Sequence, residues 1–147
     1  MDLSGRGLHS LYTELLEDAV QILTEPDEQA KLWHQIAKSH FMTGRLDAAL
    51  RSLGNSLKIC KEIGNRSGEG TTLSNISQIY DARGDYETAL EYLGESLQIR
   101  KEIGDRSGMI PVLYNVASIE LKKENVKSAF DRAIGSRYIR SYSCSNA

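Results

Sequence analysis

Apolar and small side chains recur at helical spacing along most of the chain. Residues 73–80 contain one such series, in which Leu73, Ile76 and Tyr80 lie three and four positions apart, and residues 86–97 contain the next. Positions three and four apart share one face of an α-helix, so each series predicts an amphipathic helix. No stretch alternates with the two-residue period of a β-strand at comparable strength. The pattern therefore predicts an all-α protein.

The sequence also repeats itself with a period of 40 residues. Residues 54–68, GNSLKICKEIGNRSG, and residues 94–108, GESLQIRKEIGDRSG, agree at 11 of 15 positions. Small residues keep the same register, as Ala37, Ser77 and Ala117 show. Internal repetition at this length is typical of a solenoid, in which each unit buries its apolar face against its neighbours.

Each unit is predicted to be a pair of antiparallel helices. The first pair falls in residues 27–66, the second in 67–106 and a more divergent third in 107–140. Residues 1–26 are expected to contain a lone helix that packs on the first unit, and residues 141–147 are expected to be a disordered tail. The prediction is an α-solenoid of about seven helices.

Glycines mark the expected ends of the helices. Gly84 lies between the two helices of the second unit, where glycine can adopt the left-handed conformation that ends a helix. Between units, Gly64 is followed by Ser67, whose hydroxyl could cap the next helix. The third unit departs from this pattern, with Glu120 at the tyrosine position and Glu124 at the glycine position. This end of the chain is the least regular part of the predicted fold.

The arrangement resembles the tetratricopeptide repeat (TPR) family, whose helix-turn-helix unit has small, aromatic and turn-glycine positions at set offsets. In the second unit these positions hold Leu73, Ser77, Tyr80, Gly84, Ala89 and Ser96. The usual period of the family is about 34 residues, so the extra residues are expected to lengthen the second helix of each unit and its loop. In this respect the chain is similar to the extended repeats of kinesin light chains and of Pins-type adaptors. The resemblance implies a right-handed superhelix.

The resemblance further implies that the first helix of each unit lines a concave groove, in which a peptide segment of a partner protein binds. The register places these candidate peptide-binding residues on that surface: Lys31, His34, Gln35, Lys38, Met42, Thr71, Ser74, Asn75, Gln78, Asp81, Tyr114, Asn115, Ser118 and Lys122. Phe41 and Leu121 lie on the same surface and offer further apolar anchors.

Two features of this surface suggest what it would bind. Asn75 and Asn115 lie 40 residues apart, and an amide can donate to and accept from the backbone of an extended peptide at once. The alternative interpretation is that they are surface asparagines on duplicated units. Three lysines against the single carboxylate of Asp81 favour an acidic or extended polar peptide.

Composition and charge exclude several classes of function. The chain has 147 residues, 40% of them hydrophobic, and a net charge of −2, so it lacks the basic excess that binding along nucleic acid needs. Its apolar runs are too short to span a membrane, and its N-terminus has no secretion signal, so we expect a cytoplasmic protein. Cys60 and Cys144 are not near other metal ligands in the sequence and are expected to be free thiols.

No catalytic residue, metal site or cofactor is predicted. His34 and His40 are six residues apart, which places them on different faces of a helix, and His40 takes the packed position of Tyr80 in the next unit. We therefore predict a protein-interaction module, an adaptor or scaffold, rather than an enzyme. The alternative is a structural or regulatory fragment of a larger repeat protein that forms a homodimer through the uncapped apolar edge of its third unit.

Overall fold

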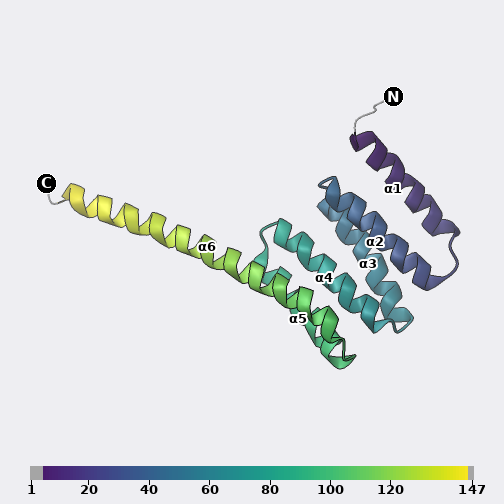
Figure 1. Ribbon diagram of the computed structural model, residues 1–147. Coiled ribbons are helices and arrows are strands. Elements are labelled where there is room, and N and C mark those ends of the chain that lie inside the picture. Colours follow the sequence, from purple (N-terminus) through teal and green to yellow (C-terminus); the bar gives the residue numbers. More distant parts are fainter. Residues whose placement is uncertain (1–4, 146–147) are drawn as a thin grey trace.

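In the computed structural model, the described residues 5–145 form six α-helices and no strand (Figure 1). The helices are α1 (Gly5–Ile22), α2 (Pro26–Met42), α3 (Leu46–Glu62), α4 (Arg66–Ala82), α5 (Tyr86–Glu102) and α6 (Arg106–Ser145). Their side chains are described for residues 7–135. The all-α solenoid is confirmed, with six helices in place of about seven.

From α2 onward the helices begin at a constant interval. Their first residues are 26, 46, 66, 86 and 106, which are 20 residues apart. Helices α2 to α5 each contain 17 residues, so the extra length of the repeat is shared by both helices of a pair. The expectation that the second helix and its loop would take up the extra residues was wrong, because the first helix of each pair is equally long.

Each of the four turns between α2 and α6 contains a glycine in the left-handed region. The φ angles are 74° at Gly44, 70° at Gly64, 78° at Gly84 and 71° at Gly104. A side chain at such a φ would meet the following backbone carbonyl, so glycine is favoured there. The predicted role of Gly84 is confirmed.

The residue after the glycine caps the next helix in three of the four turns. Asn65 Oδ1 accepts a hydrogen bond from the Gly68 amide at 2.8 Å, and Asp105 Oδ1 accepts one from the Gly108 amide at 2.8 Å. Asp85 does the same for Thr88. The expected capping role of Ser67 was therefore wrong, because Asn65 lies at the start of the helix and Ser67 lies inside it.

The apolar core runs along the stack of helices. One buried cluster joins the first unit to α4 and consists of Ala37, Ala49, Leu53, Ile76 and Ile79. A second joins α5 to α6 and consists of Ala89, Leu93, Val112 and Ile119. Each helix pair is thus held partly by the pair beside it, as in a solenoid.

Buried serines replace alanine at one family position. Ser56 donates a hydrogen bond to the Ala30 carbonyl at 3.1 Å, and Ser96 donates to the Gly70 carbonyl at 2.7 Å. Both hydroxyls are fully buried, so an unpaired one would lose its hydration without compensation. The paired carbonyls explain why serine is tolerated there.

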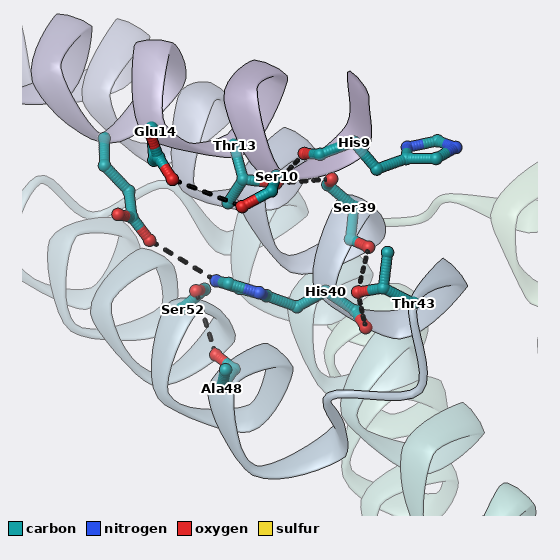
Figure 2. A network of polar contacts seen from close by, with 10 residues as sticks. His9, Ser10, Thr13, Glu14, Ser39, His40, Thr43, Ala48 and Ser52 are labelled. Atoms are coloured by element: carbon teal, nitrogen blue, oxygen red, sulfur yellow. Dashed lines mark hydrogen bonds and ion pairs between the residues drawn. The ribbon is translucent and has the colours of Figure 1, made fainter. Parts of the chain in front are cut away.

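Helix α1 packs on α2 through polar as well as apolar contacts (Figure 2). The hydroxyls of Thr13 and Ser39 lie 2.6 Å apart, and because Thr13 donates to the His9 carbonyl, Ser39 is the donor between them. His40 Nε2 lies 3.4 Å from a Glu17 carboxylate oxygen, and the ring is 7% exposed. His40 is thus a packed residue, as predicted.

The third unit differs from the sequence-based prediction. Helix α6 continues through residue 124 without a turn and projects beyond the other helices (Figure 1). The physical reason is that Glu124 stands where the earlier turns have a glycine, and glutamate favours continuation of the helix. Residues 141–145, expected in a disordered tail, lie in α6, and residues 146–147 are outside the described part of the chain.

Candidate functional site

A groove of about 640 Å³ lies between α2 and α4. It is lined by eight of the candidate residues: Lys31, His34, Gln35, Lys38, Met42, Thr71, Asn75 and Gln78. The five residues from α2 are spaced three or four positions apart, so they share one face of that helix. The three residues from α4 have the same spacing and share one face of α4. The structure therefore brings together eight of the ten predicted residues of the first two units.

Apolar side chains form part of this groove. Ala37 and Leu53 are 3% and 2% exposed, and Ile79 is 2% exposed. Phe41 and Met42, at 39% and 64% exposed, lie at the end of α2. Leu53 and Ile79 were absent from the predicted set because both belong to the buried core, and only their packing shows that they also line the groove.

His34 is held in place by a threonine hydroxyl from a neighbouring helix. Its Nε2 lies 2.9 Å from Thr72 Oγ1 and its Nδ1 lies 3.5 Å from Ser56 Oγ. Thr72 donates its own proton to the Gly68 carbonyl, so the ring donates from Nε2 to Thr72. Burial lowers the pKa of His34, which favours the neutral ring. His34 therefore links α2 to α4 while one face lines the groove.

The two lysines of the groove differ in their surroundings. Lys31 Nζ lies 2.7 Å from Asp27 and 2.8 Å from Glu28, and hydrogen bonds to these carboxylates raise the pKa of Lys31. Lys38 is exposed, and among the described residues no carboxylate forms an ion pair with it. Lys38 is therefore the cation of the groove whose charge is not offset by a described neighbour.

The other six candidates do not line this groove. Lys122 Nζ lies 2.7 and 2.9 Å from the two carboxylate oxygens of Asp81, so this pair ties α4 to α6. Tyr114 is 73% exposed on α6, and Asn115 and Ser118 are half-buried on the same helix. Ser74 is half-buried on α4. The structure thus separates Asn115 from the groove that contains Asn75.

Sequence reasoning missed a second groove, of about 530 Å³, between α1 and α2. It is lined by Leu8, His9, Tyr12, Gln35, Lys38, Ser39 and Met42. Three of these residues line the first groove as well, so the exposed ridge of α2 separates two adjacent hollows. The four-residue spacing of Leu8 and Tyr12 was the available signal, but it did not show where α1 would pack.

Two further observations concern the described residues only. Within residues 5–145, no helix is both long enough and apolar enough to cross a membrane. No group of three or more His, Cys, Asp or Glu side chains in that part of the chain is arranged to hold a metal ion.

Comparison with known proteins places this geometry in context. A family model described as the tetratricopeptide repeat matches residues 28–102. No curated protein matches the sequence significantly. Solved structures resemble the fold at low sequence identity. The crystal structure of BtubC (BKLC) from P. vanneervenii is 22% identical with a TM-score of 0.70, and the match covers 82% of this chain and 51% of that one.

The apo form of RapI is 21% identical with a TM-score of 0.70, over 84% of this chain and 46% of that one. The nearly identical TPR-like repeats of a protein designated a kinesin light chain, from Podosopora anserina, are 18% identical with a TM-score of 0.65, over 84% of this chain and 63% of that one. The chain therefore spans between 46% and 63% of the length of these structures. At such identities the likeness shows the fold.

Proposed function

The chain belongs to the tetratricopeptide repeat family, and from that premise we propose that it is a protein-interaction module whose α2–α4 groove binds an extended, acidic segment of a partner protein. The observation that carries this proposal is the meeting of Lys38, Asn75 and Gln78 around one groove, next to apolar side chains. The proposed role is recognition in the cytoplasm, as an adaptor, rather than catalysis.

The chemistry of the groove supports an extended peptide. The side-chain amides of Asn75 and Gln78 each offer both a donor and an acceptor, which matches the alternating N–H and C=O groups of an extended backbone. Phe41 and Met42 offer an apolar anchor at one end, where a large side chain of the peptide could be buried. Main-chain hydrogen bonds would thus supply affinity, and the anchor would supply register.

Charge supports the acidic character of the segment. Lys38 and Lys31 line the α2 side of the groove, whereas no carboxylate is among its lining residues. Complementary charge chiefly raises the association rate and discriminates against wrong partners. We therefore expect acidic peptides to bind faster at low salt than at high salt.

The test is selection of binding peptides from a random display library on the full chain, followed by fluorescence polarisation with the best sequence. Selected peptides should be rich in Asp and Glu, and the variant Lys38→Ala/Asn75→Ala should weaken binding by about tenfold or more, because a hydrogen bond to a charged group and a buried amide contact are lost. The matched control is Asn55→Ala/Lys58→Ala, which changes the same residue types at exposed positions on α3. Equal binding by both double variants, or selection of neutral or basic peptides, would contradict the proposal.

A further inference from the structure

The first half of α6 has a face that is covered in the earlier repeats and uncovered here. Leu113 is 47% exposed and Ala117 is exposed. The residues 40 positions earlier, Leu73 and Ser77, are 3% and 1% exposed, in a helix that packs on α5. An adjacent side of this segment is packed, since Val112 is fully buried against α5. The missing cover is thus a helix in the position that α5 has beside α4.

The second half of α6 keeps part of the apolar pattern of that missing helix, although Ala133 and Arg137 stand where α5 has Leu93 and Leu97. Val126 and Phe130 are 59% and 63% exposed, and Ala129 is exposed as well. The equivalent residues of α5 are Tyr86, Ala89 and Leu90, which all belong to the core cluster of that helix or pack against it. One chain therefore contains both helices of a pair, and the faces that would pack against each other are exposed in both.

The segment between the two halves keeps most features of a turn. Lys123 Nζ lies 2.6 Å from Glu87, and this ion pair repeats that of Arg83 with Asp47 in the preceding repeat. Asn125 occupies the position of the capping residue Asp85, and asparagine is a favourable cap. Only the left-handed glycine is missing, because its position is Glu124.

We propose that residues 126–135 fold back onto residues 113–120 of the same chain, so that α6 interconverts between an open helix and a closed third helix pair with Glu124 as the hinge. Closing places a non-glycine residue at positive φ, which is unfavourable. It also buries Leu113, Val126 and Phe130, which is favourable by a comparable amount or more. The two terms oppose each other, so the balance between the open and closed forms depends on the residue at position 124.

The covering segment comes from the same chain for two reasons. A tethered segment has a high effective concentration, whereas a second copy must lose translational and rotational freedom on binding. In the open helix, Leu113 and Ala133 are 20 residues apart in sequence and therefore lie about 200° apart around the axis. A straight α6 consequently cannot use both faces against one second copy. This inference does not depend on the function of the α2–α4 groove.

The experiment measures one distance in the full chain. Spin labels are attached to cysteines introduced by Ser107→Cys and Ile134→Cys, with Cys144→Ser; Cys60 is 1% exposed and therefore protected from labelling. Both positions are expected to be exposed in either form, since their equivalents Ser67 and Gly94 are exposed. The labels are about 40 Å apart on a straight helix and less than about 20 Å apart in a closed pair. Pulsed electron paramagnetic resonance should show both distances.

Two pairs of variants locate the hinge and the covered face. Glu124→Gly should raise the ratio of the short to the long distance by about tenfold, because the strain at positive φ is removed. Lys127→Gly replaces an equally good helix former at a position outside the turn, and it should not change this ratio. Ala129→Asp should abolish the short distance by placing a charge in the closed pair, whereas Lys127→Asp should retain it.

Three results would overturn the proposal. The first is a wild-type distribution that contains the long distance alone. The second is a short distance that survives Ala129→Asp. The third is a short distance that disappears when the labelled chain is diluted with an excess of unlabelled chain, since that result would assign the covering segment to a second copy.

Discussion

Residues 73–93 and residues 113–133 hold the same register in consecutive repeats, but only the first segment forms a helix pair with a turn. In the first segment the chain reverses at Gly84, whose φ is 78°, and Leu73 becomes 3% exposed. In the second it continues through Glu124 as a helix, and Leu113 remains 47% exposed. The two segments thus differ in the backbone freedom of the turn residue, and also in the apolar residue that follows it, since Ala133 stands where the first segment has the buried Leu93.

The largest expected contrast concerns the two equivalent leucines. Leu73→Ala should lower the free energy of unfolding by about 2–5 kcal/mol, because it leaves a cavity in the core. Leu113→Ala should lower it by about 1 kcal/mol or less, because that side chain is half exposed. Urea denaturation followed by circular dichroism measures both. Equal losses in the two variants would show that the third repeat is as well covered as the second.

A smaller contrast is expected at the turn position itself. Gly84→Ala should cost about 1–2 kcal/mol of stability, because alanine must adopt a positive φ. Apart from Gly84 and its two chain neighbours, no residue has an atom within 4 Å of the position that the added Cβ would occupy, so the loss can be assigned to the local backbone rather than to a clash with packed residues. Glu124→Ala should leave stability unchanged or slightly higher, because alanine is the better helix former. If Glu124→Ala lowered the stability as much as Gly84→Ala, a turn at residue 124 would be indicated.

The smallest contrast is between two caps in the same register. The Gly108 amide and the Arg100 guanidinium lower the pKa of Asp105, so the carboxylate contributes stability above its unfolded pKa of about 3.9. This contribution is lost as the pH falls through the lower pKa of the folded state. Asn65, 40 residues earlier, makes the same amide contact and does not titrate.

Replacing Asp105 with asparagine tests this assignment. Between pH 5 and pH 3, the urea concentration at the unfolding midpoint should fall further in the wild type than in Asp105→Asn. At pH 7 the midpoint of the variant should be the lower of the two, because the variant lacks the ion pair with Arg100. Parallel loss in both proteins over that range would assign the acid sensitivity to other carboxylates.

Most of the fold could be predicted from the sequence because the repeat supplies the same information more than once. The period, the helices of the first two units and the left-handed Gly84 all follow from local pattern and register. The continuation of α6 could not be predicted in the same way. Val126, Ala129 and Phe130 still match positions of a helix pair, but Glu120 and Ala133 replace Tyr80 and Leu93. The choice between turn and helix therefore depends on several small differences, Glu124 among them.

The candidate site could be predicted only as far as helix faces determine it. The positions on α2 and α4 share a groove because each helix presents a fixed stripe to the same side. The Thr72 hydroxyl that binds His34 lies 38 residues away in sequence, and the Asp81–Lys122 pair spans 41 residues. Such contacts depend on how the helices pack, which the spacing of residues within one helix does not specify.

The left-handed glycines lie at residues 44, 64, 84 and 104, and the next position in this series is residue 124. Codons for glycine and glutamate are neighbours in the genetic code, so a minimal change in a gene can convert one into the other at this position. A repeat protein of this kind can therefore gain or lose its terminal unit without insertion or deletion of any sequence. The number of closed helix pairs would then be an inherited character that varies independently of the number of encoded repeats.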